Sequence, residues 1–212
     1  MILNFWIGLG AALALIYGAA YCWRGGNGWT RSAVKTGSMA CLAVASVALG
    51  APVWVVAGLA LGALGDFCLS RPGQAAFLAG MAAFALGHLA YATYFMGLSG
   101  TFGPFSPMVA PFIFFAATTE FWLVPHTGAL RWPVRAYVVM ITLMGVAALL
   151  QWDLVLLAGA GLFILSDVLL ALVLFVMPAA RLRWVLAVAL WAAYWLGQFL
   201  ILQGGLAAIS AA

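Results

Sequence analysis

The sequence has very few charged residues. Of its 212 residues, four are acidic, eight are basic and 68% are hydrophobic. A soluble domain has about 25% charged residues, so this composition excludes a soluble globular protein. A transmembrane helix needs about 20 apolar residues, which leaves room for about eight helices and for no domain outside the bilayer.

The sequence also lacks the patterns of a metal site, a disulfide framework or a nucleic-acid surface. Its cysteines, Cys22, Cys41 and Cys68, are widely spaced and include no Cys-x-x-Cys pair, so we expect free thiols. His126 lies in a loop well away from the acids along the chain, so we expect no metal ion and no other cofactor. The eight basic residues are spread over several loops and form no patch, which argues against a nucleic-acid partner.

Long apolar runs separated by Gly, Pro and polar residues predict an all-α, polytopic membrane protein. We expect one domain, residues 1–212, with eight transmembrane helices. Their expected ranges are about Ile2–Cys22, Ala33–Leu49, Val53–Ser70, Gln74–Leu98, Met108–Val124, Val134–Leu150, Leu154–Met177 and Trp184–Gln203.

The basic residues predict the orientation of these helices. All eight fall on the odd-numbered loops and their edges: Arg24, Arg31, Lys35, Arg71, Arg131, Arg135, Arg181 and Arg183. Because basic loops stay in the cytoplasm, we expect the odd loops inside the cell and both termini outside. The high Ala, Gly and Trp content is typical of a bacterial protein, so we expect the bacterial plasma membrane.

Two acids lie within predicted transmembrane helices. Inserting a charged side chain near the bilayer centre costs roughly 2.5–3.5 kcal/mol. Asp66 and Asp167 should lie at matching depth, roughly 20 Å from the outer surface. Two carboxyls at one level cannot both ionise cheaply, so we expect one to keep its proton. Alternatively, both are buried aspartic acids hydrogen-bonded to the backbone or to a serine such as Ser166. The remaining acids are expected in a solvated turn (Asp153) and near a helix end, at the interface or paired with an arginine (Glu120).

Two predicted hairpins resemble each other. Asp66 and Asp167 each lie 13 residues into one helix, and His88 and Gln198 each lie 14 residues into the helix that returns. This match predicts a four-plus-four parallel repeat, although chance similarity between Leu- and Ala-rich helices would also produce it. His88 and Gln198 are candidate site residues; the alternative for each is a hydrogen bond that only joins two helices. In straight helices they would lie roughly 10 Å from the level of the aspartates.

Five stretches carry a resemblance to a known family: LGALGDFCLS, FLAGMAAFALGHLAYATYF, LRWPVRAYVVMITLMGVA, AGAGLFILSDVLLAL and AAYWLGQFLI. In this order the chain resembles the YhhN-like lysoplasmalogenase family of integral membrane proteins. The resemblance implies eight helices and hydrolysis of the vinyl ether bond of a lysoplasmalogen. The implied products are a fatty aldehyde and glycerophospho-ethanolamine or -choline. Lys35 matches the lysine of a Lys-Pro pair in the family, whereas Thr36 replaces the proline.

Vinyl ether hydrolysis suggests roles for the polar residues. Protonation of the β-carbon gives an oxocarbenium ion, which water captures, and the hemiacetal then collapses. One of Asp66 and Asp167 would donate the proton, the other would stabilise the cation, and His88 would act as base. Tyr91 and Gln198 would position water or the substrate oxygen. The other expected substrate-binding residues are Tyr194, Tyr137, Lys35 and Arg71, the two cations binding the phosphate.

Two rival functions use the same residues. A small-molecule or proton-coupled transporter also carries intramembrane acids and internal repeats. A structural membrane subunit would use polar side chains only to join helices. The expected partners are therefore a lysophospholipid and the lipid bilayer for the hydrolase, and a transported solute or ion for the carrier.

Overall fold

The apolar runs of the sequence fold as α-helices. The computed structural model describes residues 2–24, 26, 28–98, 107–151, 153–177 and 182–210. Within these residues the helices are α1 (Ile2–Ala20), α2 (Trp29–Ala48), α3 (Val53–Leu69), α4 (Gln74–Gly97), α5 (Val109–Trp122), α6 (Arg131–Leu149), α7 (Leu154–Ala171) and α8 (Arg183–Ser210). The all-helical fold and the order of eight helices are confirmed. Arg181, one of the cations used to predict the orientation, lies outside the described residues.

In the part of the chain that the structure describes, four helical stretches are long and apolar enough to cross a membrane: Gln74–Gly97, Gly128–Leu149, Leu154–Val176 and Arg183–Ile209. Phe5–Ala20 and Val53–Leu69 are shorter apolar helices. The α5 helix has 14 residues, and α2 carries Arg31 and Lys35 in its first turns. The chain is therefore a membrane protein, and the crossing of the bilayer by all eight helices stays a prediction.

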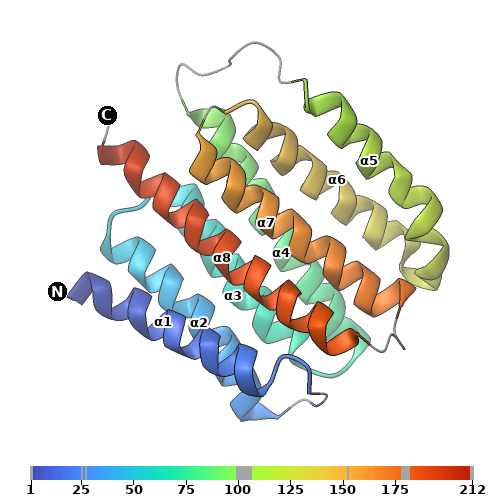
Figure 1. Cartoon of the computed structure of the whole chain (residues 1–212), viewed down its shortest axis with the longest axis horizontal. Coiled ribbons are helices and arrows are strands. Elements are labelled where there is room, and N and C mark those ends of the chain that lie inside the picture. The colour runs from blue at the N-terminus through green and yellow to red at the C-terminus, as the bar shows by residue number, and fades with distance from the viewer. Residues whose placement is uncertain are drawn as a thin grey trace.

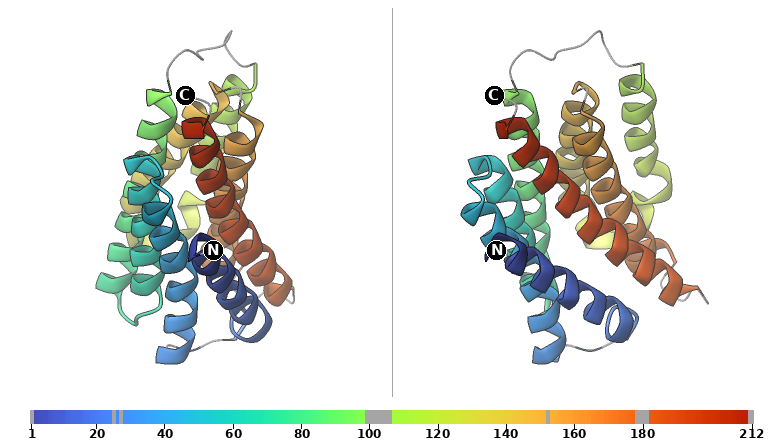
Figure 2. Two further views of the ribbon diagram at one scale, coloured as in Figure 1. Left: turned by 90° about the vertical axis from the view of Figure 1, so that its left-hand side faces the viewer. Right: turned by 60° about the vertical axis from the view of Figure 1, so that its left-hand side comes forward.

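The helices form antiparallel pairs whose joined ends gather at one edge of the molecule. The ends of α1, α3, α5 and α7 and the starts of α2, α4, α6 and α8 lie along the lower right of Figure 1, and the other helix ends lie along the opposite edge. We call the first edge the basic end, because the Arg and Lys residues of the described chain lie in or beside its connections. The α8 helix packs on α7 and reaches α1, α2 and α3, whereas α4 packs on α3 and α6. Figure 2 shows α5 at the edge of the bundle, where it packs on α6.

Glycines bring the helices of two hairpins into close contact. A methyl group added at Gly58 of α3 would lie 2.3 Å from the Tyr91 ring of α4. The same addition at Gly159 of α7 would lie 2.9 Å from Ile201 of α8. In each hairpin the glycine precedes the intramembrane aspartate by eight residues, and the contacted residue follows His88 or Gln198 by three. These matching contacts are what a duplicated hairpin would produce.

We predict that Gly58→Ala destabilises the protein by about 1–3 kcal/mol, because the new methyl group overlaps the buried Tyr91 ring. The unfolding temperature in detergent micelles measures this loss. Gly8→Ala is the matched control, since no atom lies within 4 Å of the added carbon in that helix. Equal unfolding temperatures for the two variants would contradict the packing described here.

Candidate functional site

Asp66 is buried in α3 with a basic partner of its own. Its Oδ1 lies 2.8 Å from Lys35 Nζ of α2, and its Oδ2 accepts a 3.0 Å hydrogen bond from the Tyr194 hydroxyl of α8. We call these three residues the Asp66 cluster. Only 1% of the aspartate surface is exposed. A carboxylate at this depth requires a compensating charge, which Lys35 supplies.

Asp167 of α7 has a different set of partners. Its Oδ1 accepts a 2.9 Å hydrogen bond from the Tyr137 hydroxyl of α6, and its Oδ2 lies 3.0 Å from His88 Nε2 of α4. We call these three residues the Asp167 cluster. Its acid faces an imidazole and a phenol, whereas Asp66 faces a lysine.

The backbone fixes the proton on one nitrogen of His88. Its Nδ1 lies 2.7 Å from the Phe84 carbonyl oxygen, which can only accept, so Nδ1 carries a hydrogen. Nε2 lies 3.0 Å from Asp167 Oδ2, although the angles at this contact are not those of a hydrogen bond. Neither atom has another polar partner among the described residues, so the two face each other across this contact.

Aromatic rings separate the two clusters. The Phe163 ring stacks on His88 at 4.2 Å between centroids and lies 5.7 Å from the Tyr194 ring. On the other side of α3, Gly65 leaves room for the Phe84 ring, since an added methyl group there would lie 2.6 Å from it. The arrangement thus differs from the expected pairing of the two aspartates, because their carboxyls point at different helices.

A further hydrogen bond joins α4 to α8 beside these clusters. The Tyr91 hydroxyl donates to Gln198 Oε1, and both side chains are fully buried. The Gln198 amide nitrogen faces Gly62 of α3, where the absence of a side chain leaves room for it. Tyr91 and Gln198 are therefore buried beside the clusters, and neither residue lines any of the cavities described next.

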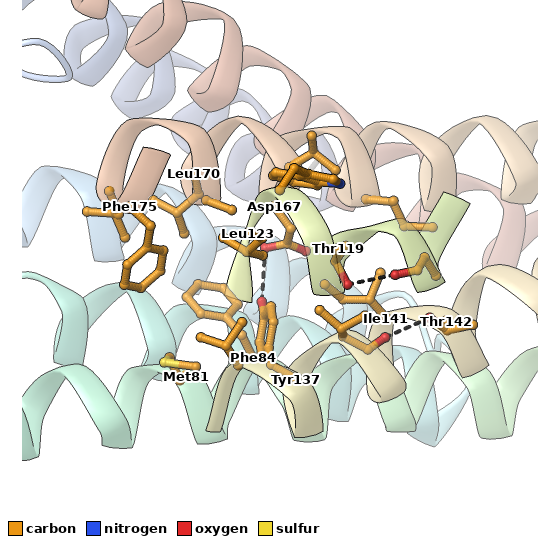
Figure 3. Close-up of a pocket in the computed structure, with 18 of the residues that line it drawn as sticks. Met81, Phe84, Thr119, Leu123, Tyr137, Ile141, Thr142, Asp167, Leu170 and Phe175 are labelled. Atoms are coloured by element: carbon orange, nitrogen blue, oxygen red, sulfur yellow. Dashed lines mark hydrogen bonds between the residues drawn. The ribbon is translucent and has the colours of Figure 1, made fainter. Parts of the chain in front are cut away.

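Asp167 lies in the wall of an apolar cavity between α4, α5, α6 and α7. Figure 3 shows the Tyr137–Asp167 hydrogen bond beside Phe84, Leu123 and Ile141. The cavity volume is about 90 Å³, and Asp167 and Tyr137 are at its most polar point. We call it the apolar cavity. Its narrow shape and lining fit a hydrocarbon chain.

A wider and more polar cavity lies at the basic end. Its volume is about 480 Å³, and four cations line it: Arg24, Arg31, Lys35 and Arg183. We call it the basic cavity. It shares four wall residues with the apolar cavity, namely Leu69, Phe77, Leu170 and Leu174. The two cavities are therefore neighbours, and Lys35 connects the basic cavity to the Asp66 cluster.

Sequence reasoning missed part of this arrangement. The sequence indicates only an orienting role for Arg24 and Arg31. A loop cation that binds a ligand has the same sequence pattern as one that sets the topology of the helices. Arg71, expected to bind phosphate, is not in the wall of the basic cavity. Its guanidinium stacks over the Trp29 ring at 4.0 Å and donates to the Ser32 hydroxyl. It thereby fastens the α3–α4 turn to the start of α2.

The difference in depth expected between His88 and the aspartates is not found for Asp167. Counting along straight helices left His88 roughly 10 Å from the aspartate level, yet its Nε2 lies 3.0 Å from Asp167. The α4 and α7 helices belong to different hairpins, so their positions along the bundle axis are set independently of the matching sequence counts.

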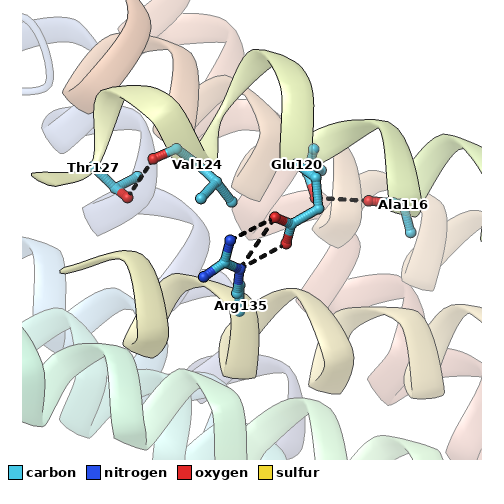
Figure 4. A network of polar contacts seen from close by, with 6 residues as sticks. Ala116, Glu120, Val124, Thr127 and Arg135 are labelled. Atoms are coloured by element: carbon cyan, nitrogen blue, oxygen red, sulfur yellow. Dashed lines mark hydrogen bonds and ion pairs between the residues drawn. The ribbon is translucent and has the colours of Figure 1, made fainter.

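Glu120 pairs with an arginine, one of the two alternatives left open by the sequence. Arg135 donates to both of its carboxylate oxygens, at 2.7 to 3.1 Å, and so ties α5 to α6 (Figure 4). The pair is exposed and lies apart from both clusters. In the described residues, no three side chains of the His, Cys, Asp and Glu types gather closely enough to hold a metal ion.

Comparison with known proteins gives one match. The model of the YhhN family matches residues 30–205. This range contains both clusters. No curated protein and no solved structure matches the chain.

We predict that Lys35→Met lowers the free energy of unfolding by about 3 kcal/mol, because it leaves the buried Asp66 without its counter-charge. The double variant Lys35→Met, Asp66→Leu should recover most of this loss, since it removes both charges. Thermal unfolding in detergent micelles compares the two. An unchanged unfolding temperature for Lys35→Met would mean that the pair does not hold α2 to α3.

Proposed function

The chain belongs to the YhhN family, whose model matches most of its length, and on this premise we propose that it is a membrane-embedded hydrolase of the vinyl ether bond of lysoplasmalogens. The observation that carries this proposal is the Asp167–His88 pair, whose aspartate lies in the wall of the apolar cavity. Hydrolysis of a vinyl ether begins with transfer of a proton to its β-carbon. We propose that this pair supplies that proton, beside a cavity whose apolar lining suits a hydrocarbon chain.

The two neighbouring cavities match the two ends of such a lipid. We assign the glycerophosphate headgroup to the basic cavity, where arginines can form bidentate hydrogen bonds with phosphate. We assign the alkenyl chain to the apolar cavity. Since the cavities share a wall, the vinyl ether between headgroup and chain would lie close to Asp167.

The reaction then proceeds in three steps. Asp167, as the acid, protonates the β-carbon of the vinyl ether and leaves an oxocarbenium ion next to its own carboxylate. Water adds to the cationic carbon, and its released proton passes to the Asp167–His88 pair, giving a hemiacetal. The hemiacetal loses its hydroxyl proton, the glycerol oxygen gains one and the C–O bond breaks, which yields the aldehyde and the glycerophospho-alcohol.

The Asp66 cluster has a supporting role in this scheme. Lys35 lines the basic cavity and is held by Asp66 in the position from which it can reach the phosphate. Tyr194 donates to Asp66, and its ring packs against Phe163, which stacks on His88. We therefore assign the proton donor to Asp167 and a positioning role to Asp66.

The basic end gives the orientation in the membrane. We propose that it faces the cytoplasm, with both termini on the far side of a bacterial plasma membrane. A lysolipid in the cytoplasmic leaflet would then have its headgroup at the level of the basic cavity and its chain directed toward the bilayer centre.

A proton-coupled carrier is the second candidate, because the buried Lys35–Asp66 ion pair is of a kind found in transporters. Uptake of a solute or of protons by vesicles containing the protein, without turnover of lysoplasmalogen, would favour it.

We predict that the purified protein releases aldehyde from a lysoplasmalogen and that Asp167→Asn slows this release by about 10²- to 10⁴-fold, the contribution typical of a general acid. Glu120→Gln is the control, since this exposed carboxylate lies apart from the clusters. Aldehyde release is measured by reduction with a coupled dehydrogenase. Full activity of folded Asp167→Asn would contradict the assignment of the proton donor.

We predict that Arg24→Gln and Arg183→Gln each raise KM for the lysolipid about tenfold with little change in kcat, since each removes one charge-assisted contact to the phosphate. Arg131→Gln is matched to them, because it removes a cation of the basic end that does not line the cavity. Steady-state kinetics over a range of substrate in mixed micelles separates KM from kcat. If all three variants behave alike, the headgroup does not bind in the basic cavity.

A further inference from the structure

A third cavity continues the apolar cavity away from the basic end. It lies between α5, α6 and α7, and every residue that lines it is apolar. Four residues line both cavities: Phe112, Phe115, Ile164 and Val168. We call the two together the apolar groove. Its far part reaches Leu149 and Leu157, close to the α6–α7 connection.

The groove runs in the direction that a lipid chain would take. The helix continues beyond α7 as a π-helical turn, Leu172–Val176, so Asp167 lies nine residues, roughly 13 Å, from the end of this helical stretch at the basic end. From Asp167 to Leu157 the groove follows α7 for ten residues, roughly 15 Å. A molecule with its phosphate at the basic end and its ether at Asp167 would extend its chain along this path.

Two glycines shape the far part of the groove. A methyl group added at Gly145 of α6 would lie 2.4 Å from the Phe112 ring, so this glycine seats α5 closely against α6. At Gly161 of α7 an added methyl group would meet no atom within 4 Å. Gly161 therefore faces open space, and the missing side chain leaves the groove clear at this level.

We propose that the apolar groove binds the alkenyl chain of the substrate over its whole length and that Gly161 determines how long a chain is accepted. The proposal rests on the proposed hydrolase function. The occupant follows from continuity, because the groove runs past the carboxyl that would protonate the vinyl ether. Besides Asp167, the described residues that line it include four with a polar group, Thr119, Trp122, Tyr137 and Thr142, and its far part is lined by apolar residues. A side chain at Gly161 would close the groove about six residues beyond Asp167, which is roughly 9 Å along α7.

The test compares Gly161→Leu and Gly161→Phe with Gly8→Leu and Gly8→Phe. Gly8 of α1 also faces open space, and it does not line the groove. Replacing a helical glycine by leucine favours the helix, so folding is expected to be preserved, and unfolding temperatures check this. The substrates are lysoplasmalogens with octadecenyl and decenyl chains.

For each variant we compare kcat/KM for the long-chain substrate with kcat/KM for the short-chain substrate. We expect this ratio to fall about tenfold in Gly161→Phe, because a side chain that overlaps the bound chain costs an amount typical of overpacking. Gly161→Leu should give a smaller fall, and the Gly8 variants should match the unsubstituted protein. Equal ratios in Gly161→Phe and Gly8→Phe would overturn the assignment of Gly161 while leaving the hydrolase function intact.

A binding measurement distinguishes failure of this inference from failure of the proposed function. Saturated ether lysolipids with octadecyl and decyl chains have no vinyl ether to cleave, and their binding is measured by native mass spectrometry of the protein in detergent. Weaker binding of the octadecyl lipid to Gly161→Phe alone supports the groove even if no lysoplasmalogen is hydrolysed. Equal binding to all variants shows that the groove holds only bilayer lipid and overturns the inference.

Discussion

A carboxyl group at this depth needs a partner, and the way the partners are supplied organises the whole bundle. If the chain is divided into α1–α4 and α5–α8, each aspartate lies on the third helix of its half. Each is held by the second helix of the same half, through Lys35 or Tyr137, and by the fourth helix of the other half, through Tyr194 or His88. The two halves therefore cannot separate without each carboxyl losing one of its two partners.

The partners differ, and this difference separates the two carboxyls in chemistry. A lysine next to Asp66 favours a permanent charge pair, which suits a rigid support. A tyrosine and an imidazole next to Asp167 leave it without a permanent cation as a partner. Only this second carboxyl lines the apolar cavity. The two halves thus hold their carboxyls in the same way, and the different partners make Asp167 the carboxyl to which we assign proton transfer in the proposed function.

The sequence was sufficient for the helices and for most of the polar residues. Apolar runs and their Gly and Pro boundaries identified eight helices, and the cost of ionisable groups in lipid identified Asp66, Asp167 and His88. Which helix each carboxyl faces could not be predicted, because a small rotation about a helix axis redirects a side chain without changing the hydrophobic pattern. The aspartates were expected at one depth and acting together on one substrate, whereas their carboxyls face different neighbours.

Residues on separate hairpins were hardest to place. Tyr137 was expected to bind substrate, and Phe163 looks like an ordinary aromatic residue of an apolar helix. Only the packing of the helices reveals that Tyr137 donates to Asp167 and that Phe163 stacks on His88. The glycines of α3 were an available signal. Gly58, Gly62 and Gly65 indicated a close approach of helices, and the rings and amide that fill those spaces are the ones around the two clusters.

The same cations explain why topology and binding are hard to separate in this protein. A lysolipid has its phosphate at the surface of the leaflet, and positive-inside cations lie at that same level. In the proposed function and orientation, Arg24 and Arg183 meet both requirements from one position in the wall of the basic cavity. The depth of a carboxyl then decides which bond of the lipid it can reach. Asp167 lies roughly 13 Å along the helix from Val176, where the π-helical turn that continues α7 ends. In the proposed function this is the depth of the ether linkage, and a carboxyl several turns deeper would meet only saturated chain.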